Sequence, residues 1–251
     1  MNKQERMLEI VRLVNLSGTV MVNDLIEILQ VSDMTIRRDL ASLEQEGQLT
    51  RIHGGAKSNS RLSFNELSHE EKHHQNMQAK RLVAQKALQL IEEGDSIFLG
   101  PGTSVEVLAE EIHCRRLQVV TNCWPIFHLL FKKRTDTFKV ILLGGEMRER
   151  TQAFVGEMTN HMLGEIYFNK MFFSGNGVKN GRVLTSDFNE AQTQRLALGR
   201  SNATYLLIDD SKLGREDFTS ICNLNSLTSV ITDLDSDKVQ QEIKPYTSVI
   251  V

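Results

Sequence analysis

Glycine and hydroxyl side chains gather in residues 100–104, whose sequence is Gly-Pro-Gly-Thr-Ser. An apolar stretch that suits a strand precedes this segment, and a helical pattern follows it. Glycine lets the backbone approach a ligand closely, and the free amides and the dipole at a helix N-terminus favour phosphate. Gly102, Thr103 and Ser104 are therefore predicted to bind an anion. A tight turn without a ligand is the alternative for this motif taken alone.

Polar or glycine-rich turns also follow several other strand-like stretches. In open α/β sheets the ligand crevice lies beyond the carboxyl ends of the strands, so turns at these ends are expected to converge. Such convergence favours the anion-binding loop over a plain turn. The further residues predicted at this cleft are Thr121, Asn122, Gly144, Gly175, Asn176, Gly177 and Lys212.

A second set of basic and hydroxyl side chains opens a helical pattern over residues 33–45, after a tight turn. In a helix-turn-helix, the second helix lies in the major groove and offers its first residues to the base edges. Arginine can hold guanine O6 and N7 together, and short hydroxyls reach phosphates or bases. The predicted DNA contacts are Ser32, Thr35, Arg37 and Arg38, with Arg51 and His53 in a following β-wing. Solvated charges on an ordinary helical domain are the alternative, and Asp39 is expected to pair with an arginine or with the first helix.

The spacing of apolar residues differs between two parts of the chain. The helical patterns of the first part lie at 3–16, 22–29 and 33–45, and an alternating stretch with two glycines follows at 49–56. They predict a winged helix-turn-helix over residues 1–57, and the polar residues 58–78 are expected to form a linker. The later strand candidates lie at 96–99, 117–120, 139–143, 170–174, 203–208 and 229–232. Because helical patterns alternate with them, residues 79–251 are predicted to form a mostly parallel α/β domain.

Composition limits the class of protein. The chain has 251 residues, 40% of them hydrophobic and 24% charged, which is typical of a globular protein. No apolar stretch approaches the roughly 20 residues that span a bilayer. Residues 1–57 hold seven Lys and Arg against eight Asp and Glu, so DNA binding would depend on a local positive patch. The three cysteines lack a CxxC spacing and no apolar signal segment follows Met1, so a reducing cytoplasm is expected.

Two sequence segments that follow each other closely resemble a known family. Residues 31–40 read VSDMTIRRDL, and residues 49–56 read LTRIHGGA. Together they closely resemble the DNA-binding signature of the DeoR family of bacterial repressors. Further matching segments, at 98–103, 153–156, 176–181 and 195–198, extend the resemblance over nearly the whole chain. The resemblance implies operator double-stranded DNA and a sugar-phosphate effector as partners, with release from the operator when the effector binds.

Within the family, these segments are most similar to the branch that controls lactose use. That similarity implies repression of a sugar-utilisation operon and tagatose 6-phosphate as the effector. Many members of the family carry Asp where Gly100 stands and Lys where Gln194 stands. The roles of those two side chains are therefore not carried over to this sequence.

The C-terminal part also resembles the sugar-phosphate isomerase fold of ribose-5-phosphate isomerase. This resemblance implies Thr103, Ser104 and Lys212 as phosphate ligands. Glu190 is expected on a helix surface, although the DeoR-family resemblance implies a position near the ligand cleft. An isomerase is therefore the main alternative function. Aldose–ketose isomerisation needs a base and usually a paired acid, whereas residues 174–177 hold no carboxylate where the isomerases carry an acidic cluster. The sequence is expected to bind a sugar phosphate without acting as an enzyme.

Three histidines, His69, His73 and His74, raise the alternative of a metal site. The first two would share one helical face, but no fourth ligand with suitable spacing is apparent, so a solvated linker face without metal or cofactor is expected. Trp124 and Phe127 are expected in the core or at an interface. One small DNA-binding module buries too little DNA for tight specific binding, so a homo-oligomer on paired half-sites is expected. Inducer and corepressor action of the ligand both remain open.

Overall fold

The computed structural model describes residues 2–58 and 66–251. It divides into two compact units, Met1–Leu67 and Ser68–Val251. Residues 59–65 of the expected linker lie outside the described residues. Residues 68–78, which were expected in the linker, belong to the second unit, whose boundary lies at residue 68 rather than 79. Two helices begin in this stretch, at His69 and Met77. Within the described ranges, no helix is both long enough and apolar enough to cross a membrane.

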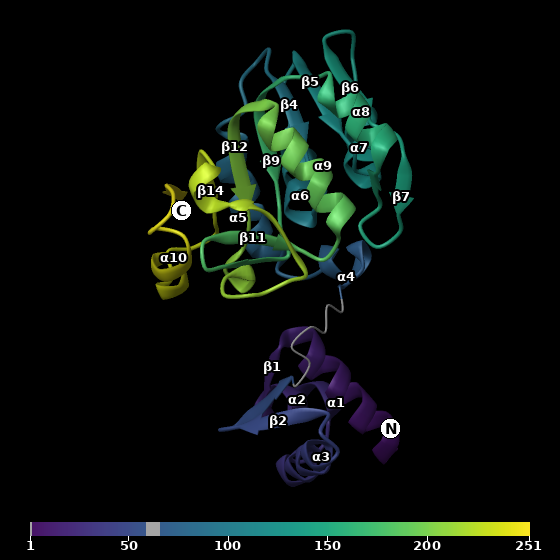
Figure 1. Ribbon diagram of the computed structural model, residues 1–251, viewed down its shortest axis with the longest axis vertical. Helices are drawn as coiled ribbons and strands as arrows, with labels where there is room; N and C mark the ends of the chain where they lie inside the picture. Colours follow the sequence, from purple (N-terminus) through teal and green to yellow (C-terminus); the bar gives the residue numbers. More distant parts are fainter. Residues whose placement is uncertain (1, 59–65) are drawn as a thin grey trace. The chain divides into compact units, whose positions relative to one another are not determined.

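The N-terminal unit combines three helices with a small antiparallel sheet (Figure 1). Its helices are α1 (Lys3–Ser17), α2 (Val22–Leu29) and α3 (Asp33–Gln45). Its strands are β1 (Thr19–Met21), β2 (Leu49–Ile52) and β3 (Gly55–Ser58), in the order β1-β3-β2. The predicted helices and wing are confirmed. Ser32 caps α3, since its Oγ accepts a hydrogen bond from the amide of Thr35 at 3.4 Å, and such caps mark helix starts.

An acidic side chain lies within the aliphatic core of this unit. Asp39 is 1% exposed, and its Oδ2 accepts a hydrogen bond from Nε of Arg6 at 2.6 Å. The predicted pairing of Asp39 with the first helix is therefore confirmed. A charge this deeply buried needs a partner. The pair also holds the carboxylate on the inner side of α3, away from its solvent face.

The C-terminal unit is built on a seven-stranded sheet in which all neighbouring strands are parallel. The strands are β4 (Ser96–Leu99), β5 (Leu117–Thr121), β6 (Phe138–Leu142), β9 (Phe168–Phe173), β12 (Ser201–Leu207), β14 (Ser229–Ile231) and β15 (Val249–Ile250). The predicted parallel α/β architecture is confirmed, and β15 is an additional edge strand that the sequence patterns missed.

Helices cover both faces of this sheet. They are α5 (Met77–Leu88), α6 (Thr103–Glu111), α7 (Trp124–Phe131), α8 (Glu157–Gly164), α9 (Phe188–Gly199) and α10 (Asp237–Glu242). A further short helix, α4 (His69–His73), packs against α6. Side chains of β9 alternate between two cores: Phe172 packs with α5, α6 and α7, while Met171 and Phe173 pack with α8 and α9. Figure 1 shows α9 in front of the sheet and α5 and α6 behind it.

Short elements complete the unit. They are the hairpin β7 (Glu146–Arg148) and β8 (Ala153–Val155), the antiparallel sheet of β10 (Gly177–Lys179), β11 (Arg182–Thr185) and β13 (Thr219–Asn223), and the 3-10 helices η1 (Asp210–Lys212) and η2 (Leu224–Ser226). In the large sheet the strand order is β15-β14-β12-β9-β4-β5-β6. The chain therefore reverses direction across the sheet between β4 and β9, which is the switch point where such folds bind ligands.

Candidate functional site

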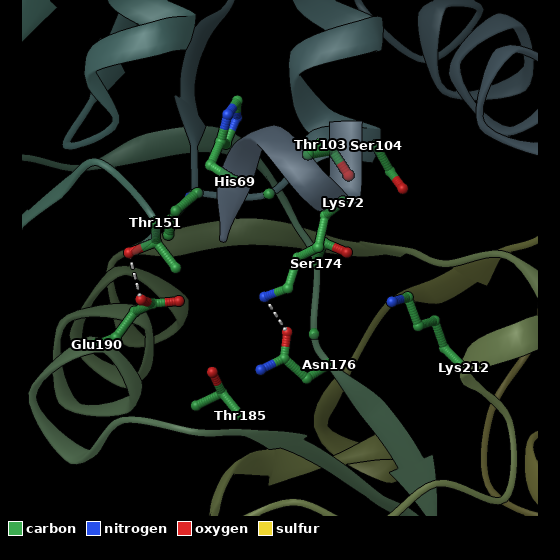
Figure 2. Close-up of a pocket in the computed structure, with 13 residues that line it drawn as sticks. His69, Lys72, Thr103, Ser104, Thr151, Ser174, Asn176, Thr185, Glu190 and Lys212 are labelled. Carbon is green, nitrogen blue, oxygen red and sulfur yellow. Dashed lines mark hydrogen bonds between the residues drawn. The ribbon is translucent and has the colours of Figure 1, made fainter. Parts of the chain in front are cut away.

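A pocket opens at this switch point, where β4 and β9 end (Figure 2). It contains about 510 Å³, including space open to solvent. The residues predicted from sequence that line it are Gly102, Thr103, Ser104, Gly175, Asn176, Glu190 and Lys212. The other lining residues are His69, Lys72, Pro101, Thr151, Ser174 and Thr185.

The loop between β4 and α6 forms one wall. Gly102 has a φ of +138°, and a Cβ there would lie 2.8 Å from Cβ of Ser174. Both the backbone conformation and the close approach therefore require glycine. Thr103 and Ser104 begin α6 and are only 8% and 4% exposed. This wall offers hydroxyl groups and the first amides of a helix, which have no partner within the helix itself.

The facing wall comes from the residues that follow β9. Oγ of Ser174 donates to the carbonyl of Leu207 at 2.8 Å, which ties the end of β9 to β12. Oδ1 of Asn176 accepts from Nζ of Lys72 at 3.0 Å, and its Nδ2 donates to Asp217 at 2.8 Å. Figure 2 shows the Lys72–Asn176 bond in the middle of the pocket. The amide of Asn176 is thus oriented with its oxygen toward a lysine.

Lys212 supplies a second positive charge. It ends η1, just after β12, and is half-buried. Loss of contact with water lowers its pKa to about 8; Asp209 opposes this shift, whereas Arg215, Lys72 and Lys80 add to it. Other cations therefore repel the Lys212 ammonium, and a bound anion would relieve this repulsion.

The opposite side of the pocket presents a carboxylate. Glu190 of α9 is 5% exposed, and its Oε2 accepts from Oγ1 of Thr151 at 2.9 Å and from Nη1 of Arg148 at 3.3 Å. In Figure 2 the Glu190–Thr151 pair and Lys212 lie at opposite sides of the view, with Lys72 between them. The pocket therefore has a cationic side and a separate side suited to hydroxyl groups.

Helix α4 brings in residues that the sequence patterns left in a linker. Ser68 and Glu71 form a capping box: Oγ of Ser68 accepts from the amide of Glu71 at 3.2 Å, and the amide of Ser68 donates to the Glu71 carboxylate at 2.8 Å. The helix carries His69 and Lys72 into the pocket. The Ser-x-x-Glu spacing was the signal in the sequence for a helix start here.

The solvated face expected for the histidines is wrong for two of them. The side chains of His69 and His73 are 11% and 28% exposed, and their ring nitrogens lie 2.9 and 3.0 Å from Oε2 of Glu106. The buried carboxylate of Glu106 therefore contacts the imidazole rings of His69 and His73, which pack against the C-terminal unit. Within the described part of the chain, no group of three His, Cys, Asp or Glu side chains is arranged to hold a metal ion.

Four predicted cleft residues do not line this pocket. They are Thr121, Asn122, Gly144 and Gly177. The buried side chains of the first two donate to the main-chain carbonyls of Leu99 and Phe154, at 2.7 and 2.8 Å. The carbonyl of Gly144 accepts from Thr159 at 2.8 Å, and a Cβ at Gly177 would lie 2.4 Å from the carbonyl oxygen of Arg215. These contacts hold the strand ends together outside the lining of the pocket.

The two departures from the family pattern are neighbours in space. A Cβ at Gly100 would lie 3.1 Å from Oε1 of Gln194, which is 1% exposed on α9. An Asp at position 100 and a Lys at position 194 would therefore face each other. In this chain both charges are absent together, so the two departures amount to one local change beside the pocket.

The solvent face of α3 carries the predicted DNA contacts. Ile36, which points inward, is fully buried, whereas Arg37 and Arg38 are exposed. Nε of Arg37 donates to Asp33 at 2.8 Å, and both side chains are about half exposed, so the guanidinium remains accessible. Met34, which the apolar period of the sequence places among the anchors of this helix, is instead 80% exposed on this face. An apolar side chain here suits contact with a thymine methyl group.

The remaining predicted DNA contacts flank this helix. Oγ of Ser32 lies 2.9 Å from Oγ1 of Thr35, so the two hydroxyls share the start of α3. Arg51 and His53 are exposed on β2 and at the tip of the wing. The amide of Arg51 donates to Glu44 of α3 at 2.8 Å, which fixes the wing against the helix that carries the arginines.

A winged helix-turn-helix joined to an α/β unit with a polar pocket defines a ligand-responsive DNA-binding regulator. Residues 6–62 match the family described as "DeoR-like helix-turn-helix domain", and residues 75–234 match "DeoR C terminal sensor domain". The chain belongs to the DeoR family of transcriptional regulators.

Curated relatives match along the whole chain. A "Lactose phosphotransferase system repressor" of Streptococcus mutans serotype c is 56% identical over 250 residues, covering 100% of both chains. A protein of the same name from Staphylococcus aureus strain NCTC 8325 is 53% identical with the same coverage. Among solved structures, ribose 5-phosphate isomerase A from Methanocaldococcus jannaschii has a TM-score of 0.39 and 15% identity, covering 55% of this chain and 54% of that chain.

Proposed function

We propose that this chain represses a sugar-utilisation operon and that tagatose 6-phosphate releases it from operator DNA. The charge arrangement of the pocket carries the proposal: Lys212 and a helix N-terminus lie apart from a single buried acid, and Lys72 lies between them. Such a pocket suits a ligand with a phosphate at one end and hydroxyl groups at the other. The family of the chain and the names of its full-length relatives support the DNA-binding role and the sugar context.

The phosphate would be held at the start of α6. Amides and hydroxyls of Thr103 and Ser104 donate hydrogen bonds, and the helix dipole favours a negative charge there. Lys72 and Lys212 supply ammonium groups, whose bonds to a phosphate are charge-assisted and therefore stronger than neutral ones. A phosphate monoester carries a charge of roughly −1.5 to −2 at pH 7, so it would relieve the repulsion between these cations.

The sugar would lie toward α9. The carboxylate of Glu190 can accept hydrogen bonds from sugar hydroxyls, and Thr151, Thr185 and Asn176 offer further polar groups. The same carboxylate repels a phosphate, so the ligand can enter in only one favourable orientation. This division makes the phosphate necessary for affinity and the hydroxyl pattern necessary for specificity.

The N-terminal unit would bind DNA through the major groove. Arg37 and Arg38 face the bases and phosphates, Ser32 and Thr35 add short contacts, and Arg51 with His53 holds the backbone from the wing. The chain acts as a homo-oligomer on paired half-sites. Effector binding then favours a conformer whose DNA-binding units no longer match the half-site spacing, which requires different effector affinities for the two conformers.

An isomerase is disfavoured by the same geometry. Proton transfer between adjacent carbons needs a base and usually a paired acid. Glu190 is the only carboxylate among the described residues that line the pocket, and it already binds Thr151 and Arg148. Binding without turnover follows. Incubation of tagatose 6-phosphate with the full chain should therefore leave the sugar unchanged.

Calorimetric titration of the full chain tests the effector. Tagatose 6-phosphate should bind at least about tenfold more tightly than tagatose, because hydrogen bonds to charged groups contribute roughly 1.5–3 kcal/mol each. Lys139, an exposed lysine on β6, provides the control: Lys139→Gln should leave this preference unchanged. Equal affinity for the two sugars would contradict the proposed phosphate site.

A further inference from the structure

Helix α4 is both the first element of the C-terminal unit and a wall of the pocket. Residues 59–67 lead along the chain from β3 to Ser68, which caps this helix. His69 and Lys72, one helical turn apart, both line the pocket. A movement of α4 would therefore shift the point at which the connecting residues enter the C-terminal unit.

Two buried charged residues outside the pocket fasten α4. Glu106 of α6 is 7% exposed, and its Oε2 lies 2.9 Å from Nε2 of His69 and 3.0 Å from Nδ1 of His73. Lys80 of α5 is 3% exposed, and its ammonium donates to the main-chain carbonyls of Lys72 and, at 3.5 Å, of His73. Since isolated helices this short are unstable in water, these contacts maintain the shape of α4.

A third fastening of α4 lies inside the pocket. Nζ of Lys72 donates to the neutral amide oxygen of Asn176 at 3.0 Å. A phosphate dianion is a stronger acceptor, because charge-assisted hydrogen bonds are roughly twice as strong as neutral ones. A phosphate bound near Thr103 and Lys212 would therefore draw Lys72 away from Asn176.

We propose that α4 transmits effector occupancy from the pocket to the residues that connect the two units, and that Lys80 is the positioning residue for this response. The inference rests on the proposed effector site. Because Lys80 holds the carbonyls of the last helical turn, α4 moves as one body when the Lys72 side chain moves toward the phosphate. Without Lys80 this last helical turn loosens, and the Lys72 side chain reaches the phosphate with little movement of the helix.

The test compares Lys80→Met with Lys86→Met in the full chain. Lys86 lies on the same helix, and its ammonium also donates to two main-chain carbonyls, those of Thr232 at 2.8 Å and Asp233 at 3.1 Å, away from α4. For each protein, calorimetry gives the affinity for tagatose 6-phosphate. Fluorescence anisotropy gives the operator affinity without the sugar phosphate and at saturation, and the ratio of these two values measures the coupling.

The wild type and Lys86→Met are expected to show the same coupling, in the usual range of about 5–150-fold. Lys80→Met should keep both separate affinities within about threefold while its coupling falls below about threefold. If Lys80 had a purely structural role, Lys80→Met would lower the affinities for the effector and for the operator and leave the coupling unchanged. Full coupling in Lys80→Met would overturn the inference. Effector binding to the wild type without any coupling would instead contradict the proposed function.

Hydrogen exchange on the wild type keeps the inference testable if Lys80→Met does not fold. The amide of Lys72 donates to the carbonyl of Ser68 at 3.0 Å and reports on the first turn of α4. Saturating tagatose 6-phosphate should change exchange rates in residues 68–76 by at least about threefold and leave residues 82–88 unchanged. Unchanged exchange in residues 68–76 with the effector bound would also overturn the inference.

Discussion

The affinity for a phosphorylated sugar is expected to fall as the pH rises from 7 to 9, because Lys212 loses its proton over this range in the ligand-free protein. Burial lowers the pKa of Lys212 to about 8. A phosphate beside the ammonium favours its charged form, so binding raises this pKa toward the ordinary value of 10.5. The bound state therefore holds a proton that the free state has lost above pH 8.

The size of the effect follows from the two protonation states. Free Lys212 is about 90% protonated at pH 7 and about 10% protonated at pH 9, so the affinity should fall about tenfold between them. At the acid end, the phosphate itself takes up a second proton near pH 6, which weakens its attraction for the lysines. Maximal affinity is therefore expected between about pH 6 and pH 8.

Calorimetric titrations of tagatose 6-phosphate at half-unit steps of pH measure this profile. Lys212→Gln should bind roughly 10- to 100-fold more weakly at pH 7, from the loss of one charge-assisted bond, and should lack the decline between pH 7 and pH 9. Lys139→Gln should retain the wild-type profile. A wild-type affinity that is constant from pH 7 to pH 9, or a decline that persists in Lys212→Gln, would refute the assignment of Lys212 to the phosphate.

Three further substitutions test other parts of the structure. Asp39→Asn leaves the largely buried Arg6 without its ionic partner and should destabilise the N-terminal unit by about 3 kcal/mol. Thermal melting should show the lower stability, and operator titration should show weaker binding. The affinity for the effector should be unchanged. Arg37→Ala should weaken operator binding while changing stability by less than about 0.5 kcal/mol, since the side chain is exposed; an equal loss of effector binding would contradict this role. Gly102→Ala should destabilise the protein by more than about 1 kcal/mol and remove effector binding, because of the positive φ and the close contact with Ser174. Gly199→Ala is the control, since a Cβ there meets no atom within 4 Å, and calorimetry should find normal effector binding.

Local signals made the N-terminal unit predictable from sequence. The apolar period and the Ser32 cap fix α3 within a few residues, and two glycines mark the tip of the wing. The Gly102 loop was also predictable, because a strand, a glycine turn and a helix start follow one another along the chain. These features depend on neighbours in sequence, which a pattern can detect.

The rest of the site depends on strand order and on contacts between distant residues. Thr121 and Asn122 follow a strand as predicted, but β5 lies one strand away from the switch point, and strand order cannot be read from periodicity. Lys72 lies in a polar stretch without an apolar period. Its placement in the pocket depends on Glu106 and Lys80, buried charges from two other helices.

Fluorescence anisotropy on the promoter DNA upstream of the gene, at fixed salt, tests the link between effector and operator. Specific binding should be lost when tagatose 6-phosphate is added and should persist with unphosphorylated tagatose. Specific binding that tagatose 6-phosphate leaves unchanged would contradict the effector proposed for this pocket, and binding that is only salt-sensitive and blind to sequence would contradict the repressor function itself.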